Sequence, residues 1–169
     1  MEKCIFITGG VRSGKSNFAE QVVQTCEQPS AYVATSVAFD DEMKARILRH
    51  QNDRQDQGFD WTLYEMPYTL SSDIKEPVVL FECLTTWLSN MLFLQPSDNP
   101  VLQFQQWLQQ LLVTGKTVVV VSNEVLDAGL TPYTETNTYL QTMGALHCWL
   151  VEQSDAAYEL TNHIVKKWK

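Results

Sequence analysis

The sequence has few basic residues. Among its 169 residues, 12 lysines and arginines stand against 20 aspartates and glutamates, which gives a formal net charge of −8 at pH 7. A protein that binds nucleic acid through the phosphate backbone needs a cationic face, so this charge argues against a general nucleic-acid-binding protein. A small-molecule substrate fits the composition better, and no nucleic-acid partner is expected.

Cysteine is also scarce, and its spacing does not suit metal binding. The four cysteines, at positions 4, 26, 83 and 148, form no CxxC pair. Structural zinc sites and disulfide frameworks rely on close or regular cysteine spacing, so we expect neither. We predict reduced thiols in a cytoplasmic protein.

Long apolar runs are missing as well. The apolar segments are far shorter than the roughly 20 residues that a membrane-spanning helix needs, and no signal peptide precedes the first expected strand. The most linker-like stretch, QPSDNP at residues 95–100, has the length of an ordinary connection. We therefore predict one cytoplasmic domain over residues 1–169, with no membrane span.

The apolar segments that are present alternate with stretches of helical periodicity. Short runs bounded by glycine, proline or polar residues are typical of strands buried on both faces of a parallel sheet. Such runs lie at residues 4–8, 31–35, 78–82 and 117–122. Helices are expected at residues 14–26, 40–54, 84–94, 101–113 and 133–153. The pattern predicts an α/β fold in which helices flank a mostly parallel sheet.

The last segment of the chain has a different pattern. In AYELTNHIVKKW, residues 157–168, alternating apolar residues flank the polar pair Thr161-Asn162. Such alternation around polar turn residues is typical of a β-hairpin. We predict a C-terminal β-hairpin, with His163 solvated in its turn.

The segment GGVRSGKS carries the strongest local signal for function. It matches the P-loop pattern GxxxxGK[ST] and lies between an apolar strand and a helix, as that loop requires. Its glycines let backbone N–H groups converge on phosphate oxygens, while Lys15 can reach the β- and γ-phosphates and Ser16 can bind Mg²⁺. The alternative is a glycine-rich turn with a surface lysine. The residues expected to bind the nucleotide are Gly9, Gly10, Val11, Arg12, Ser13, Gly14, Lys15 and Ser16, of which Lys15 is also catalytic.

A carboxylate follows the apolar run VVLFE. Glu82 comes directly after four apolar residues, where P-loop proteins place an acidic residue that holds Mg²⁺ directly or through water. The carboxyl ends of parallel strands are where α/β folds bind ligands, which favours this role. The alternative is a solvent-exposed carboxylate at the end of a strand.

The segment DDEMKARILRHQNDR, residues 40–54, places three basic side chains on one helical face. Arg46, His50 and Arg54 follow at i, i+4 and i+8. A neutral imidazole can attack phosphorus, and guanidinium groups can bind the phosphates of its target. From spacing alone, however, a solvated helix face with one histidine is the more common explanation.

Six segments in a fixed order resemble the adenosylcobinamide kinase / adenosylcobinamide-phosphate guanylyltransferase family of cobalamin biosynthesis. They are TGGVRSGKS, YVATS, DDEMKARILRHQNDR, the tryptophan at position 61, ECLTTWLSN and VSNEV, and they cover residues 3 to about 125. The resemblance implies a RecA-like P-loop domain that assembles as a homotrimer. It also implies two activities: phosphorylation of adenosylcobinamide with ATP or GTP, and transfer of GMP from GTP to adenosylcobinamide phosphate.

The resemblance further implies site residues. By this resemblance, His50 would accept GMP. The place of Arg46 on the same helical face separately predicts a contact with the nucleotide phosphates, and the P-loop pattern and the strand end predict Mg²⁺ held by Ser16 and Glu82. Glu65 follows WTLY, where the sequence alone indicates only a carboxylate at a strand end. The further nucleotide-binding residues implied by the family are Ala34, Thr35, Ser36, Gln51, Asn52, Asp53, Arg54, Glu65 and Glu82.

The last quarter of the chain departs from the family pattern. Leu126 replaces a glycine after NEV, the arginines of the following helix are absent, and the expected Asn-Gln pair is His147-Cys148. Two alternatives therefore stay open: a P-loop kinase with a single activity, or a diverged nucleotide-binding protein. His147 is expected in the core or at an interface, and the tryptophans are expected to pack.

Overall fold

The computed structural model describes residues 3–37, 41, 44–45, 52, 59–125, 129 and 131–169. In this part of the chain one seven-stranded sheet has the order β3-β2-β4-β5-β1-β6-β7. Strands β1 to β6 run parallel, and β7 pairs with β6 in the antiparallel direction. The strands are β1 (Cys4–Gly9), β2 (Ser30–Ala34), β3 (Trp61–Glu65), β4 (Val78–Glu82), β5 (Thr117–Asn123), β6 (Ala156–Thr161) and β7 (Ile164–Lys167).

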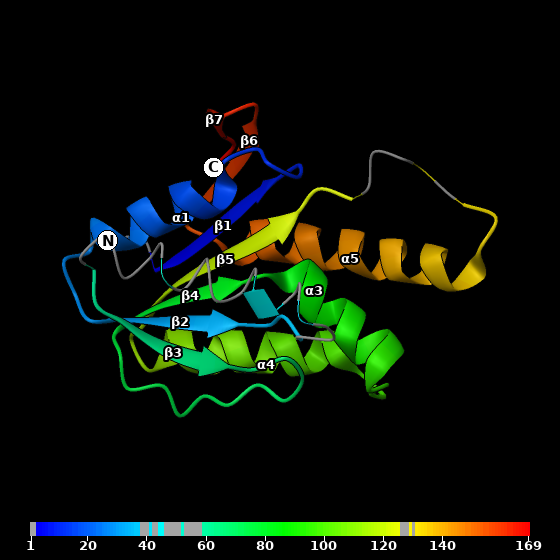
Figure 1. Cartoon of the computed structure of the whole chain (residues 1–169), viewed down its shortest axis with the longest axis horizontal. Coiled ribbons are helices and arrows are strands. Elements are labelled where there is room, and N and C mark those ends of the chain that lie inside the picture. The colour runs from blue at the N-terminus through cyan, green and yellow to red at the C-terminus, as the bar shows by residue number, and fades with distance from the viewer. Residues whose placement is uncertain are drawn as a thin grey trace.

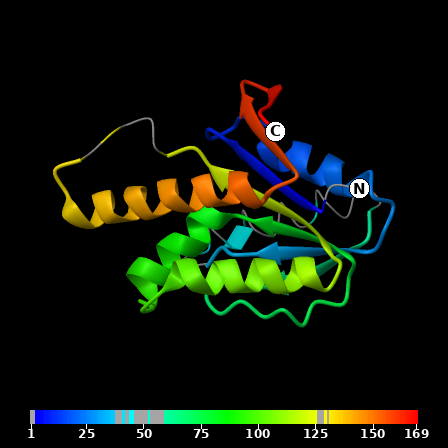
Figure 2. The same cartoon turned by 180° about the vertical axis from the view of Figure 1, so that it is seen from behind.

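Helices cover both faces of the sheet (Figure 1, and from behind in Figure 2). Helix α1 packs on one face, where its residues Ala19 and Val23 are buried against β1, β4 and β5. The helices α3, α4 and α5 pack on the other face. The bounds are α1 (Lys15–Gln24), α3 (Leu84–Ser89), the π-helix η1 (Asn90–Leu94), α4 (Pro100–Val113) and α5 (Thr134–Gln153).

Helix α4 shows how local sequence fixes these elements. The side chain of Asn99 accepts a hydrogen bond from the N–H of Leu102 at 3.0 Å, and Pro100 takes the first helical position. One face of the helix then buries Phe104 and Trp107, whose rings lie 5.4 and 5.0 Å from that of Phe81 on β4. This aromatic cluster anchors α4 to the sheet.

The register of the strands brings their carboxyl ends to one edge of the sheet. Gly9 pairs with Asn123 on β5 and with Leu160 on β6. Ala34 pairs with Glu82 on β4 and with Glu65 on β3. Side chains that follow these strands therefore share the edge at which open α/β sheets bind ligands.

Most elements predicted from sequence are confirmed, including the four central strands and the C-terminal hairpin. Two differ in detail. The expected helix 84–94 is α-helical only to Ser89 and continues as the π-helix η1. Strand β3 is the edge partner of β2. It is not among the predicted apolar runs, because Thr62 and Leu63 are exposed, although Glu65 is predicted at the end of a strand. Most of the expected helix 40–54 lies outside the described residues.

Trp87 and Trp107 are buried, which confirms the predicted packing role for these two, whereas the prediction is wrong for Trp168, which is exposed. Among the described residues, no helix combines the length and apolar composition that crossing a membrane requires.

Candidate nucleotide-binding site

The loop between β1 and α1 lies at the carboxyl edge of the sheet. Gly9 ends β1, and a Cβ atom at this position would lie 2.5 Å from the carbonyl oxygen of Leu160 and 2.7 Å from Ser13 Oγ. Gly14 precedes α1 with a φ of 91°, a left-handed conformation that glycine adopts without strain. These two glycines allow the loop to turn tightly and lead directly into the helix N-terminus, where anions bind favourably.

Lys15 folds back across the loop. Its Nζ atom donates a hydrogen bond to the carbonyl oxygen of Gly10 at 3.0 Å, and its side chain is buried. Burial lowers the pKa of Lys15, while the nearby Cys83 and Glu82 act in the opposite direction. The ammonium group is thus held beside the loop, where it can meet a phosphate.

Ser16 and Glu82 are brought together from two elements. The hydroxyl of Ser16, in the first turn of α1, donates a hydrogen bond to Oε1 of Glu82 at the end of β4. Tyr32 on β2 donates from its hydroxyl to the other carboxylate oxygen, Oε2, at 2.9 Å. The Ser16–Glu82 contact joins two residues that were predicted for the same site. Tyr32 is a further member of this site that was not predicted from the sequence.

This oxygen pair fits Mg²⁺. Mg²⁺ prefers hard oxygen ligands and usually keeps several waters, so one hydroxyl, one carboxylate and nucleotide phosphates suffice. A cluster of three or more histidine, cysteine or acidic side chains is absent from the described residues, and a P-loop magnesium site does not require one.

Two buried hydroxyls of the loop region also indicate a ligand. Among the described residues, Thr8 Oγ1 at the end of β1 and Ser13 Oγ in the loop are buried without a hydrogen-bond partner. Buried polar atoms in folded proteins are nearly always hydrogen-bonded, and exceptions coincide with sites that water or a ligand completes. Both exceptions lie in or next to the predicted phosphate loop.

A second polar cluster lies at the ends of β2, β4 and β5. Thr35 Oγ1 accepts from the N–H of Cys83 at 2.8 Å and donates to its carbonyl oxygen at 2.9 Å. Asn123 donates to Thr85 Oγ1 at 3.1 Å, and the Tyr139 hydroxyl donates to the carbonyl oxygen of Thr85 at 3.1 Å. The sequence analysis did not identify Thr85 or Tyr139 as site residues. The sequence offers only weak indications of them: Thr85 follows shortly after strand β4, and Tyr139 lies in helix α5, which packs near the end of that strand.

Tyr139 stays neutral in this cluster, because burial and, to a smaller extent, Cys83 raise its pKa to about 12. The backbone of Glu124 completes the edge, since its N–H donates to the carbonyl oxygen of Gly9 at 2.8 Å. The end of β5 is therefore tied to the start of the P-loop.

The remaining predicted residues are spread more widely. Ala34 ends β2 and is followed by Thr35 and Ser36, whereas Glu65 is exposed on β3, the edge strand four positions from β1. Asn52 is helical and exposed. The other proposed residues of this segment, Arg46, His50, Gln51, Asp53 and Arg54, lie outside the described residues.

The two histidines that were assigned no catalytic role differ. His147 is buried, its Nε2 lies 2.7 Å from Ser122 Oγ, and its ring centroid lies 5.1 Å from that of Phe6. Burial lowers its pKa to about 4, and the predicted core position is confirmed. His163 is exposed as predicted, but it also contacts the P-loop, which the sequence did not indicate.

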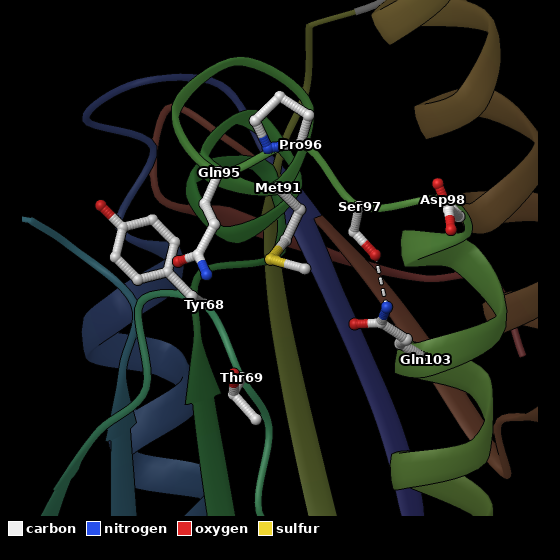
Figure 3. Close-up of a pocket in the computed structure, with 8 residues that line it drawn as sticks. All are labelled: Tyr68, Thr69, Met91, Gln95, Pro96, Ser97, Asp98 and Gln103. Carbon is white, nitrogen blue, oxygen red and sulfur yellow. Dashed lines mark hydrogen bonds between the residues drawn. The ribbon is translucent and has the colours of Figure 1, made fainter.

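A separate hollow of about 320 Å³ lies between the β3–β4 connection, η1 and the start of α4 (Figure 3). Gln103 donates a hydrogen bond to Ser97 across it. Its described lining residues are Tyr68, Thr69, Met91, Gln95, Pro96, Ser97, Asp98 and Gln103. None of these residues carries the positive charge that phosphate binding favours, so this hollow fits a phosphate less well than the P-loop does.

A parallel sheet, a glycine-rich loop after its strand β1 and a Lys-Ser pair opening the next helix define a P-loop protein. Solved structures of this type are similar to the chain. A KaiC-like protein, PH0186 of Pyrococcus horikoshii OT3, superposes with a TM-score of 0.52 at 14% identity, over 99% of this chain and 79% of that one. PH0250 of the same organism gives 0.52 at 10% identity, over 99% and 86%. The predicted RecA-like fold is confirmed.

The chain belongs to the cobinamide kinase / cobinamide phosphate guanyltransferase family, whose model matches residues 5–166. The bifunctional adenosylcobalamin biosynthesis protein CobP of Pseudomonas aeruginosa is 30% identical over 88% of this chain and 87% of its own length. The bifunctional protein CobU of Escherichia coli is 42% identical over 53% of this chain and 50% of its own length. CobU of Salmonella typhimurium is 36% identical over 61% and 56%. The chain is thus a member of a family of bifunctional biosynthetic enzymes.

Proposed function

We propose that the protein phosphorylates adenosylcobinamide with ATP or GTP and then transfers GMP from GTP to adenosylcobinamide phosphate. The observation that carries the proposal is the meeting of Lys15, Ser16 and Glu82 at the carboxyl edge of the sheet. Membership of the cobinamide kinase / cobinamide phosphate guanyltransferase family supplies the substrate class.

In the kinase step the chain binds and positions a nucleoside triphosphate. The loop N–H groups and the N-terminus of α1 bind phosphate oxygens, and Lys15 offsets the negative charge that builds on the transferred γ-phosphoryl group. Ser16 and Glu82 would hold Mg²⁺, which supplies further charge stabilisation when bound. The substrate hydroxyl attacks the γ-phosphorus, and the nucleoside diphosphate leaves.

We infer that the second step is covalent and uses His50. A nitrogen of its imidazole attacks the α-phosphorus of GTP, forming a P–N bond while the bond to the β-phosphate oxygen breaks and pyrophosphate leaves. A phosphate oxygen of the acceptor then attacks the same phosphorus. The P–N bond breaks, His50 is regenerated, and adenosylcobinamide-GDP is the product. Arg46 would contact the nucleotide phosphates, and the nucleotide would also contact Gln51, Asp53 and Arg54.

A kinase with a single activity is the second candidate. The contacts of the described residues, Lys15, Ser16 and Glu82, suffice for phosphoryl transfer and need no histidine.

We also propose, from the family resemblance, that the enzyme is a single-domain cytoplasmic homotrimer. Light scattering that gives a monomer at micromolar concentration would reject the trimer without touching the catalytic proposal.

Labelling with GTP distinguishes the two candidates. The protein is incubated with GTP labelled on the α-phosphate, and a parallel sample receives GTP labelled on the γ-phosphate. Guanylylation predicts acid-labile, base-stable protein label from the α-position only, because the γ-phosphate departs with pyrophosphate. A chase with adenosylcobinamide phosphate should move that label into a GDP-linked corrinoid. If phosphate is transferred to adenosylcobinamide but the protein carries no label, the kinase with a single activity is the candidate that remains.

A further inference from the structure

The C-terminal hairpin contacts the P-loop (Figure 1). Its turn residues Asn162 and His163 have φ values of 48° and 66°, which is the conformation of a two-residue type I′ turn. At this tip the peptide N–H of His163 donates a hydrogen bond to the carbonyl oxygen of Ser13 at 3.0 Å. Residues 162–163, near the C-terminal end of the sequence, thus contact the predicted phosphate loop, near its N-terminal end.

This hydrogen bond fixes the direction of one peptide group of the loop. In a trans peptide the C=O and the following N–H point in opposite directions. The Ser13 carbonyl points to the hairpin, so the N–H of Gly14 points away from it. The N–H groups of a P-loop point inward to bind phosphate oxygens, and a Ser13 carbonyl held on the hairpin side is compatible with that orientation of the Gly14 N–H.

The side chain of His163 packs against the same peptide. A Cβ atom on Gly14 would lie 2.5 Å from His163 Nδ1 and 3.1 Å from its Cε1. Ser13 is 4% exposed, so the contact also encloses the residue that accepts the hydrogen bond. The tip of the hairpin therefore lies directly on the loop, and the imidazole of His163 occupies the space that a side chain at position 14 would need.

We propose that the backbone N–H at position 163, and not the imidazole of His163, positions the P-loop for nucleotide binding. This N–H holds the Ser13–Gly14 peptide in the orientation that presents the Gly14 N–H to a nucleotide phosphate. The inference rests on the proposed binding of a nucleoside triphosphate at the P-loop. Nucleotide binding and the hydrogen bond from the His163 N–H to Ser13 are then coupled. The hydrogen bond raises the affinity for the nucleotide, and the bound nucleotide stabilises the hydrogen bond.

The hydrogen bond can be removed without changing any side chain. Cys148 is an exposed free cysteine, so a synthetic peptide of residues 148–169 can be ligated to a recombinant fragment at that position. An ester in place of the amide between Asn162 and His163 deletes the donor N–H. Loss of one such hydrogen bond should weaken GTP binding about three- to tenfold in calorimetry.

A matched control lies in the same hairpin. The N–H of Trp168 donates to the carbonyl oxygen of Ala157 at 2.8 Å, so an ester at Trp168 also deletes one hairpin hydrogen bond but none to the loop. This control should bind GTP like the all-amide chain. Equal binding by the two esters would overturn the proposal. Absence of GTP binding by the all-amide chain would overturn the proposed function itself, and this inference with it.

Two further measurements do not depend on the ester protein folding. His163→Gly keeps the N–H and gives Asn-Gly, a favoured type I′ pair, so GTP affinity should stay within about twofold. A loss as large as that of the ester would assign the effect to the imidazole and reject the backbone role. In the unmodified chain, GTP should slow hydrogen exchange of the His163 amide, and an unchanged exchange rate would also reject it.

Discussion

Tyr32 and Glu82 are joined by a hydrogen bond of 2.9 Å from the tyrosine hydroxyl to Oε2, while Ser16 contacts Oε1 of the same carboxylate. Tyr32 pairs with Leu80 on the neighbouring strand, and side chains two residues apart on a strand share a face. The tyrosine therefore reaches along this face to the carboxylate. It fixes the carboxylate plane and leaves Oε1 directed to Ser16.

Removing the Tyr32 hydroxyl should therefore impair the use of Mg²⁺. Tyr32→Phe keeps the ring that packs edge-on against Trp61 at 5.8 Å. A hydrogen bond to a charged group contributes about 1.5 kcal/mol or more, so the Mg²⁺ concentration that half-saturates the enzyme should rise about tenfold. Calorimetric titration of GTP at several Mg²⁺ concentrations should show the same shift independently of turnover.

The chain offers a control of the same chemistry. Tyr64 donates to Oε2 of Glu76 at 2.9 Å, and Glu76 precedes β4 rather than following it. Tyr64→Phe removes an equivalent hydrogen bond away from the P-loop, so the Mg²⁺ dependence should stay unchanged. If both variants shift it equally, the effect reflects general destabilisation, and Tyr32 has no particular role in orienting Glu82.

The sequence predicted the sheet because the runs that form it are apolar throughout. Val118, Val119, Val120 and Val121 of β5 are all buried, and such a run predicts a central parallel strand. Strand β3 was harder, since it lies at the sheet edge and its residues Thr62, Leu63 and Glu65 are exposed, so it has no continuous apolar run. The Ser16–Glu82 contact followed from the P-loop pattern and the rule that ligands bind at carboxyl ends of strands.

The missing contacts have no local signal. Tyr32 looks like an ordinary strand aromatic, and only its pairing with β4 shows that the hydroxyl reaches Glu82. Likewise, a polar residue in a hairpin turn predicts solvent exposure. That His163 contacts Ser13 depends on β6 lying next to β1, a long-range pairing that the sequence pattern does not specify.

Lys15→Met should separate stability from activity. Burial lowers the pKa of Lys15, so the unfolded chain holds this proton more tightly than the folded one. In the pH range where the unfolded chain already binds this proton, the folded state carries this penalty, so the stability of the folded state falls as the pH decreases into that range. Methionine removes the penalty, so the melting temperature should not fall. Turnover should drop about a hundredfold or more, because the charge that offsets the transferred phosphoryl group is lost. A variant that retains activity would reject the P-loop assignment.

His147 should make stability depend on pH in the acid range. Burial lowers its pKa to about 4, against about 6.5 in an unfolded chain. The stability that it contributes is fully present above about pH 6.5 and is lost as the pH falls toward 4, because the unfolded state binds the proton first. A difference of this size amounts to about 3 kcal/mol at most.

The test compares urea unfolding of the wild-type chain with that of His147→Gln between pH 7 and 4.5. Glutamine can still hydrogen-bond to Ser122, whose Oγ lies 2.7 Å from the imidazole, but it does not titrate. The wild-type chain should lose more stability over this range than the variant. Parallel curves for the two proteins would show that His147 does not control the acid sensitivity.

His50→Ala should separate the two proposed half-reactions. The substitution deletes the proposed nucleophile for GMP and leaves Lys15, Ser16 and Glu82 unchanged, so GTP binding and phosphorylation of adenosylcobinamide should continue. Protein label from α-phosphate-labelled GTP and the GDP-linked product should both disappear. Arg46→Ala is the contrasting variant: it removes one charge-assisted phosphate contact, so guanylylation should slow by about ten- to a hundredfold without stopping. A GMP adduct that persists in His50→Ala would place the nucleophile on another residue and reject this mechanism, even though the family membership would stand.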